Sequence, residues 1–314
     1  MLLRRRVKLH EWRRIPSATF ISLPGFRISI SRYGAAMPSI ADKRREYRRL
    51  HESGTFVIPN PWDIGTARYL QGMGFKALAT TSAGYAFAVG RADNAVPRDM
   101  MLAHIAELAS ASDVPVNADY ENGYAHDPQG VAENVRLCVE TGVAGLSIED
   151  STGDTAKPLY DLDHAVERVK AARAAIDKAG GDTVFTARAE CFLVGVTDLD
   201  ETIRRLKAYA AAGADCLYAP GLRTREQFEA VVKAVAPKPI NALIGFPSEM
   251  KVADFAAIGV RRISVGGALA RAAWGGMIRT AKLLTEGSFA GFADAAPHAD
   301  LNNFFRDDLK RRPS

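Results

Sequence analysis

The stretch DLDETIRRLKAYAAAGADCLYAP, residues 198–220, contains one helix and one strand in succession. Apolar residues recur at helical spacing through its first half, which predicts a helix with one buried face. That face is formed by Ile203, Leu206, Tyr209 and Ala210. We expect Arg204, Arg205 and Lys207 to point away from it. Gly213 suits the left-handed residue that closes a helix, and the apolar run after it predicts a buried strand.

Short apolar runs of this kind, separated by helical segments, recur along the chain. There are eight: TFVIPN (55–60), ALATTS (77–82), PVNAD (115–119), GLSIED (145–150), TVFTAR (183–188), DCLYAP (215–220), PINALI (239–244) and RISVGG (262–267). Gly74, Gly142 and Gly259 end further helices in the same way as Gly213. Eight such units predict an α/β fold, a (β/α)8 TIM-type barrel. The alternative is an open doubly wound sheet, but no G-x-G-x-x-G motif follows the first run.

The charge of the chain is unevenly distributed. Residues 1–36 contain eight Lys or Arg and one acid, and the rest contains 33 basic and 35 acidic residues. We predict that residues 1–36 are a basic extension without a stable fold, and a targeting peptide is the alternative. The barrel is expected over 37–286 and a C-terminal helical tail over 287–314. A nearly neutral body has no electrostatic reason to bind nucleic acid.

The cysteines and the hydropathy of the sequence indicate where in the cell the protein is located. Cys138, Cys191 and Cys216 are too few for a disulfide framework and lack metal-ligand spacing, so we expect small apolar fillers in a reducing compartment. No apolar run approaches the roughly 18 residues that span a bilayer. We therefore expect a cytoplasmic protein that does not bind membranes.

Polar side chains follow several of the predicted strands, at the end of a barrel where active sites lie. They are Asp119 and Glu121 after the third strand, Glu149 and Asp150 after the fourth, Arg188 and Glu190 after the fifth, and Asn241 near the seventh. Like charges cannot be desolvated together without a cation. Oxygen ligands without His or Cys favour Mg²⁺, or Mn²⁺, over zinc.

Two further features of these strand ends suit an anionic ligand. Ser82, Ala83 and Gly84 follow the second strand, where a hydroxyl and backbone N–H groups could hold an anionic group. The Arg188 guanidinium could bind a ligand carboxylate through two hydrogen bonds, or form a salt bridge to a neighbouring strand-end acid. Both roles of Arg188 remain open at this point.

Five segments together carry a family resemblance. They are NPWDIGTARYLQGMGFKALATTSAGYA, ADYENGY, LSIEDS, TARAE and RISVGGALARAA. In this order, over most of residues 38–285, the sequence resembles the isocitrate lyase / phosphoenolpyruvate mutase superfamily. The resemblance implies a Mg²⁺-dependent barrel that acts on small 2-oxo or 2-hydroxy carboxylates through an enolate. It also implies a homodimer or homotetramer in which the last helix is exchanged between partners.

The resemblance assigns roles residue by residue. It implies substrate binding by Trp62, Ser82, Ala83, Gly84, Arg188 and Asn241, and metal binding by Asp93, Asp119, Glu121 and Glu149. From its place after the fifth strand, we also expect Glu190 to bind the substrate. Two departures stand out. Glu121 replaces the usual second Asp of an Asp-x-Asp pair. The lyases of the superfamily carry a Lys-Lys-Cys-Gly-His loop whose Cys is the catalytic acid, and the corresponding region here, EDSTGDTAKPLYDLD (149–163), lacks it. In this respect the chain is similar to the phosphonomutase-like subgroup.

The sequence therefore predicts a carbon–carbon lyase in which Arg188 and Glu149 act in catalysis and loop 150–158 closes over the site. Tyr85, Lys157 and Glu190 are unranked candidates for the missing proton donor. One alternative is a mutase or hydrolase that breaks a phosphorus–carbon bond. Another is a barrel that binds metal and oxoacid without catalysis.

Overall fold

The computed structural model describes residues 21–23, 26–28 and 37–312, and the chain divides into two units at residues 1–35 and 36–314. In the first unit, β1 (Ile21–Leu23) pairs antiparallel with β2 (Phe26–Ile28). Most of the predicted basic extension lies outside the described residues. The second unit contains the barrel and the C-terminal helices.

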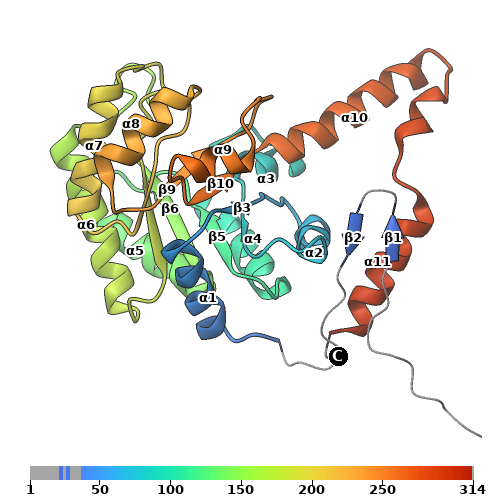
Figure 1. Cartoon of the computed structure of the whole chain (residues 1–314), viewed down its shortest axis with the longest axis horizontal. Coiled ribbons are helices and arrows are strands. Elements are labelled where there is room, and N and C mark those ends of the chain that lie inside the picture. Colours follow the sequence, from blue (N-terminus) through green and yellow to red (C-terminus); the bar gives the residue numbers. More distant parts are fainter. Residues whose placement is uncertain (1–20, 24–25, 29–36, 313–314) are drawn as a thin grey trace, which may run out of the picture. The chain divides into compact units, whose positions relative to one another are not determined.

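Eight parallel strands form a nearly closed barrel, which confirms the predicted fold class (Figure 1). They are β3 (Phe56–Ile58), β4 (Leu78–Ala79), β5 (Val116–Asp119), β6 (Gly145–Glu149), β7 (Val184–Arg188), β8 (Cys216–Tyr218), β9 (Ile240–Leu243) and β10 (Arg262–Ser264). Their order is β3-β10-β9-β8-β7-β6-β5-β4. A hydrogen bond of 3.1 Å from the Ala79 N–H to the Pro59 carbonyl joins the two end strands. Each strand lies within one of the eight predicted runs.

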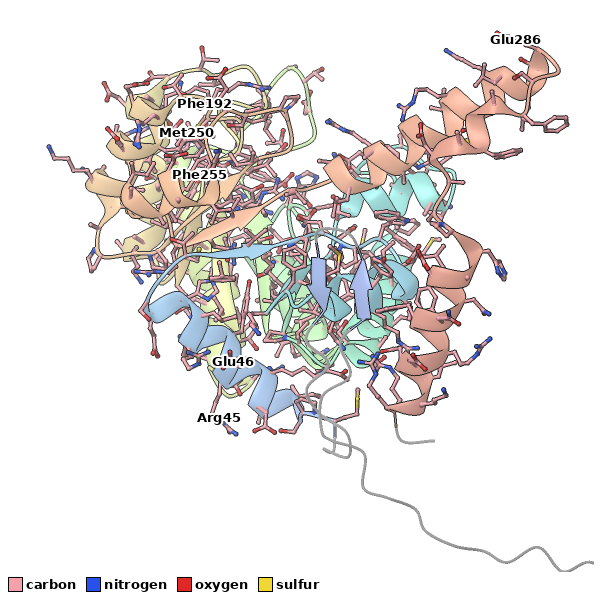
Figure 2. The ribbon with its side chains drawn as sticks, turned by 45° about the vertical axis from the view of Figure 1, so that its right-hand side comes forward. Arg45, Glu46, Phe192, Met250, Phe255 and Glu286 are labelled. Atoms are coloured by element: carbon pink, nitrogen blue, oxygen red, sulfur yellow. The ribbon has the colours of Figure 1, made fainter. Side chains whose placement is uncertain are left out.

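Helices surround the strands and alternate with them along the chain (Figure 1). They are α1 (Ile40–Glu52), α2 (Ile64–Gly72), α3 (Ser82–Ala88), α4 (Arg98–Ala111), α5 (Pro128–Glu140), α6 (Leu162–Lys178), α7 (Leu199–Ala211), α8 (Arg225–Val235), α9 (Val252–Ala257) and α10 (Ala268–Thr285). The core lies between these helices and the strands, where for example Phe228 of α8 packs edge-to-face on Phe255 of α9. In Figure 2, Phe255 lies within the body while Arg45 and Glu46 of α1 extend from its surface.

Helix α7 shows how the sequence determines a helix and its ends. Asp198 caps it by accepting hydrogen bonds from the N–H groups of Asp200 and Glu201. Its last turn gives way to Gly213, which has a φ of 104°, a conformation that only glycine adopts readily. Leu206 and Tyr209 are buried, as predicted.

The expectation that Arg205 points away from the buried face is wrong, because this side chain is itself buried. Its guanidinium lies 3.0 Å from the carboxylate of Asp150, which follows β6. The buried carboxylate of Asp150 compensates the charge of Arg205, which explains why a charged residue lies on the inner face of α7.

The C-terminal segment extends from the barrel along α10, which runs out toward Glu286 (Figure 2). The turn η1 (Ala290–Asp294) and helix α11 (His298–Lys310) follow. Phe304 of α11 packs on Tyr69 of α2 with ring centroids 4.7 Å apart, so the tail returns to the body. Several large apolar side chains of this segment are exposed. They are Trp274, Met277, Ile278, Leu284, Phe289, Phe292, Leu301 and Leu309.

The three cysteines are unpaired and buried. Burial raises the pKa of the Cys191 and Cys216 thiols. Among the described residues, no helix is both long enough and apolar enough to cross a membrane.

Candidate active site

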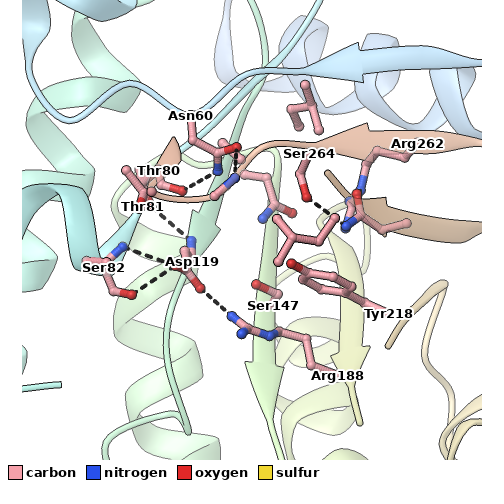
Figure 3. Close-up of a pocket in the computed structure, with 18 of the residues that line it drawn as sticks. Asn60, Thr80, Thr81, Ser82, Asp119, Ser147, Arg188, Tyr218, Arg262 and Ser264 are labelled. Atoms are coloured by element: carbon pink, nitrogen blue, oxygen red, sulfur yellow. Dashed lines mark hydrogen bonds and ion pairs between the residues drawn. The ribbon is translucent and has the colours of Figure 1, made fainter. Parts of the chain in front are cut away.

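A cavity with a volume of about 170 Å³ opens where the strands end (Figure 3). Most of the residues that line it are polar. The polar ones are Asn60, Thr80, Thr81, Ser82, Asp93, Asn117, Asp119, Ser147, Arg188, Tyr218, Asn241, Arg262 and Ser264. The interior of a TIM barrel is usually filled with branched apolar side chains. The polar lining therefore makes this cavity the candidate binding site.

Asp119 is the last residue of β5 and is held on both oxygens. Its Oδ2 accepts hydrogen bonds of 3.0 Å from the backbone N–H and the hydroxyl of Ser82. Its Oδ1 lies 2.7 Å from the Arg188 guanidinium. The Asp119 N–H donates to the hydroxyl of Thr80, 2.9 Å away. The ends of β4, β5 and β7 are thereby tied together around one carboxylate (Figure 3).

Arg188, the last residue of β7, lies among three carboxylates. Besides Asp119, it contacts Glu149 at 3.1 Å and Glu190 at 2.8 Å. Each contact uses a different guanidinium nitrogen, so one N–H on each terminal nitrogen remains for a ligand. The structure thus shows the salt bridges that sequence reasoning left as one alternative for Arg188. The Arg188 guanidinium also lies over the aromatic ring of Tyr218, with its central carbon 5.0 Å from the ring centroid.

Burial affects the protonation of Glu149 and Glu190. It raises the pKa of Glu149 and of Glu190, although the Arg188 charge acts in the opposite direction. Burial also opposes the charge of Arg188, but the surrounding acids raise its pKa well above the ordinary value. A carboxyl group of this cluster can therefore hold a proton next to a permanent positive charge.

Glu121 does not continue the strand, which ends at Asp119. Its φ of 46° is left-handed, so the alternation of side chains along β5 does not extend to it. The side chain is buried next to the Tyr124 hydroxyl, and neither its Oε1 nor that hydroxyl forms a hydrogen bond of ordinary geometry among the described residues. Burial, with the nearby charges of Asp119 and Asp93, raises the pKa of Glu121 to about 7. Asp93 lines the cavity, and burial and the Asp119 charge raise its pKa too.

The donor set suits a hard divalent cation. No three His, Cys, Asp or Glu side chains form a preassembled metal cluster within the part of the chain that the structure describes. The available donors are nevertheless carboxylate oxygens, and the buried Oε1 of Glu121 needs a partner that a cation could supply. Asp93, Asp119, Glu121 and Glu149 therefore fit the predicted magnesium or manganese site in chemistry.

The remaining predicted residues divide into two groups. Ser82, Ala83 and Asn241 line the cavity. Trp62 and Gly84 lie together behind this lining, since a Cβ on Gly84 would come within 3.2 Å of the Trp62 Cβ.

None of the three candidate proton donors is among the residues that line the cavity. Tyr85 stacks on His104 with ring centroids 3.7 Å apart. Lys157 is exposed and forms an ion pair with Asp161 at 2.6 Å. Together with His126, it lines a second cavity. Of the three candidates, Glu190 alone contacts Arg188.

Sequence reasoning did not single out several residues of the site. Asn60 accepts hydrogen bonds from the N–H groups of Val265 and Gly266 and donates to the Thr80 carbonyl. It therefore links the ends of β3, β4 and β10. Its position as the last residue of the run TFVIPN was the available signal. Arg262 was missed as well, because a charged residue at the start of a strand resembles an ordinary strand boundary.

Behind the site, Asp150 anchors the loop that follows β6. Its carboxylate accepts hydrogen bonds from the Glu190 N–H at 2.8 Å and from the Tyr209 hydroxyl at 2.5 Å, besides the contact with Arg205. Arg205 also donates to the Tyr160 carbonyl. Both ends of loop 150–160 are therefore fixed, while residues 153–157 between them are exposed.

Comparison with known proteins identifies relatives. A protein-family model described as phosphoenolpyruvate phosphomutase matches residues 47–285. A crystal structure of a candidate lyase/mutase from Burkholderia cenocepacia J2315 is 48% identical, with a TM-score of 0.82 over 85% of this chain and 96% of that one. A structure of oxaloacetate acetylhydrolase with the product oxalate is 27% identical, with a TM-score of 0.76 over 86% of this chain and 96% of that one.

The sequence of an oxaloacetate decarboxylase from Bradyrhizobium sp. strain ORS 278 is 34% identical over 235 residues, which is 68% of this chain and 77% of the relative. These matches confirm the predicted superfamily and an enzyme of the carbon–carbon lyase type within it. By its family match over residues 47–285, the chain belongs to the phosphoenolpyruvate phosphomutase family.

Proposed function

We propose that this protein uses Mg²⁺ to cleave a carbon–carbon bond of a small 2-oxo or 2-hydroxy carboxylate through an enolate. The observation that carries the proposal is Arg188, held by three carboxylates at the mouth of a cavity that Asp93 and Asp119 also line. This arrangement offers two guanidinium N–H groups to a substrate carboxylate and oxygen ligands to a hard cation. The relatives whose names contain oxaloacetate support this class of substrate.

The chain itself would bind and orient the substrate. Arg188 keeps two N–H groups for a substrate carboxylate, and Ser82 and Ala83 form the adjoining wall. Fixing the substrate in this way aligns the breaking bond before reaction. Asp93, Asp119, Glu121 and Glu149 would hold the cation, which when bound supplies Lewis-acid stabilisation for the developing negative charge.

One of the acids around Arg188 would donate the proton that the reaction requires. With oxaloacetate, breaking the bond between carbons 3 and 4 releases CO₂ and leaves an electron pair on carbon 3, which takes a proton to give pyruvate. Glu190 is our candidate proton donor, because burial raises its pKa and it contacts Arg188. The exposed part of loop 150–158 would close over the mouth and exclude water.

A second candidate is phosphorus–carbon bond chemistry on a phosphonate such as phosphonopyruvate. The description of the matching family model favours it. The same cation and the same arginine would bind a phosphonate, so the reactions differ in the bond that breaks and not in the residues that bind.

The test is an activity screen with purified protein and Mg²⁺, using oxaloacetate, phosphonopyruvate, 2-methylisocitrate and alkylated malates, with products identified by mass. We expect turnover of at least one carbon substrate, loss of activity with a chelator, and recovery with Mg²⁺ or Mn²⁺. Free Mg²⁺ itself promotes loss of CO₂ from oxaloacetate. The matched control is therefore Asp119→Asn at the same Mg²⁺ concentration, which removes a proposed metal ligand and preserves the side-chain shape.

Each outcome of the screen has a clear reading. Turnover of phosphonopyruvate alone would support the second candidate. Binding of Mg²⁺ and oxalate without turnover of any substrate would contradict both candidates and support a barrel that binds without catalysis.

Assembly and location are also proposals. Exposed apolar side chains such as Trp274, Met277 and Phe289 on the C-terminal segment support a homodimer or homotetramer built through α10. Light scattering would give the mass, and a monomer at micromolar concentration would contradict it. We also propose a cytoplasmic location.

A further inference from the structure

A second arginine, Arg262, lines the same cavity but has different surroundings. It is the first residue of β10 and only 3% exposed. Its guanidinium contacts the Asn241 amide oxygen at 2.8 Å, the Tyr47 hydroxyl at 2.8 Å, the Thr186 hydroxyl at 3.1 Å and the His51 ring at 3.4 Å. None of these groups is an acid. Among the described residues, Arg262 forms no ion pair, whereas Arg188 forms three.

The partners of Arg262 stay neutral near pH 7. Burial raises the pKa of Tyr47 to about 12, so its hydroxyl remains protonated. Burial and the Arg262 charge lower the pKa of His51 to about 3, so its ring remains uncharged. The positive charge of Arg262 is therefore solvated by neutral dipoles alone.

Arg262 lies deeper in the barrel than the acid cluster. All eight strands are parallel and run toward the mouth, and Arg262 precedes Ser264 by two residues just as Asn117 precedes Asp119. Two residues of a strand span about 6–7 Å. The cavity that contains all four residues therefore reaches from the mouth into the interior by about one layer of side chains.

The inner end of the cavity also offers hydrogen-bond donors. A guanidinium has five N–H groups, and the four contacts of Arg262 leave one of them. The Ser264 hydroxyl accepts a hydrogen bond from Asn241, so its own hydrogen is available to a ligand. Both residues line the cavity.

A buried charge is costly unless an opposite charge pairs with it. An anion that entered the cavity would pair with Arg262, whereas the acids at the mouth already engage Arg188. We propose that Arg262 and Ser264 form a subsite for the second carboxylate of a small diacid, while the first carboxylate lies at Arg188 and the metal site. This inference rests on the proposed function and specifies its substrate class as dicarboxylic.

The position of this subsite bears on which bond breaks. In a malate-type 2-hydroxy diacid, cleavage between carbons 2 and 3 turns the hydroxyl-bearing half into a 2-oxo acid as the hydroxyl proton passes to a carboxylate of the cluster around Arg188. The electron pair moves to carbon 3 and onto the second carboxylate until carbon 3 is protonated. The Arg262 guanidinium next to that carboxylate stabilises the negative charge as it develops. Loss of the second carboxylate as CO₂ would instead break the ion pair, so the subsite favours diacids whose second carboxylate is retained.

The test compares ligands that differ by one carboxylate. Malate and lactate are both 2-hydroxy acids, and oxalate has only the part expected at the mouth. With Mg²⁺ present, calorimetry on the full chain should show malate binding at least about tenfold more tightly than lactate. In Arg262→Gln this preference should fall to about twofold or less, while oxalate affinity changes by less than about twofold. Arg262→Lys should retain an intermediate preference.

Further variants serve as controls for the affinity measurements. Arg44→Gln removes a guanidinium of α1 that contacts Asp182 outside the cavity, and it should leave all three affinities unchanged. If Arg262→Gln does not fold, Ser264→Ala and Arg262→Lys carry the test through the same affinity ratio. An unchanged malate preference, or an equal loss of malate and oxalate, would overturn the subsite. Failure of the wild-type protein to bind oxalate would instead refute the proposed function, on which the subsite depends.

Discussion

Two buried arginines line one cavity and are stabilised in opposite ways. Arg188, at the mouth, contacts Asp119, Glu149 and Glu190. Arg262, one layer deeper, contacts amide, hydroxyl and imidazole groups. The first arginine neutralises acids that would otherwise repel one another. The second is held in place by neutral groups and keeps its charge available. A guanidinium near a cavity is thus defined by its partners and not by its residue type.

The largest expected effect comes from removing the arginine at the mouth. Arg188→Met leaves three buried carboxylates without their cation, which should cost about 3–5 kcal/mol of unfolding free energy. Activity should fall by about 1,000-fold or more, because substrate orientation and the metal-binding acids are both disturbed. Denaturant unfolding and steady-state kinetics measure the two effects. Adding Glu190→Gln should restore part of the stability and none of the activity.

The corresponding change at the inner end sharpens the contrast. Arg262→Met removes a charge that no acid balances, so its cost in unfolding free energy should be clearly smaller than that of Arg188→Met under the same conditions. An equal cost for the two variants would mean that the distant acids stabilise Arg262 as strongly as the adjacent acids stabilise Arg188. The two arginines would then not differ in how the protein stabilises them.

A pH effect tests the neutral partners of Arg262. The His51 ring donates through Nδ1 to the Tyr47 carbonyl, and its Nε2 faces Arg262 as an acceptor. Because burial and three nearby arginines lower the pKa of His51 to about 3, the unfolded chain takes up a proton near pH 6.5 that the folded protein rejects. Folding stability should therefore fall as the pH drops below 6.5 toward 3.

His51→Gln keeps an amide in place of the ring and cannot titrate. Between pH 7 and pH 4 the wild-type protein should lose about 1–3 kcal/mol more unfolding free energy than this variant. Urea unfolding at several pH values measures the difference. A parallel pH dependence in both proteins would mean that His51 carries no such penalty.

The smallest effect should come from Ser82→Ala at the mouth. The variant loses the hydroxyl that donates to Asp119 but keeps the backbone N–H that donates to the same oxygen. We expect a cost of about 0.5–1.5 kcal/mol in stability. We also expect a rise of a few-fold in KM with little change in kcat, since Asp119 remains bound to Arg188. A loss in kcat as large as that of Arg188→Met would show that the hydroxyl takes part in the reaction itself.

The fold could be predicted because its signals are local. Each strand of the barrel lies in an apolar run, and Gly74, Gly142, Gly213 and Gly259 all have the predicted left-handed conformation. The acids at the strand ends were found for the same reason, since Asp119 and Glu149 end strands and Asp150 directly follows one. Asp93, which comes after α3, was predicted only through the family resemblance.

Two of the missed features depend on residues far away in the sequence. Arg205 is buried because Asp150, 55 residues earlier, provides its partner. Arg262 reaches Tyr47 of α1 across 215 residues. The conformation of Glu121 follows from a turn that ends the strand early, which alternation alone does not predict.

The contact between Tyr47 and Arg262 has a consequence for protein engineering. Helix α1 comes before the first barrel strand, yet its tyrosine is fully buried and also bonds to Asn117 inside the barrel. The barrel interior is therefore completed by a helix that a count of eight strand–helix repeats would leave out. A shortened chain that begins at Phe56 would keep every repeat and lose the base of the inner pocket, whereas one that begins at Met37 would retain it.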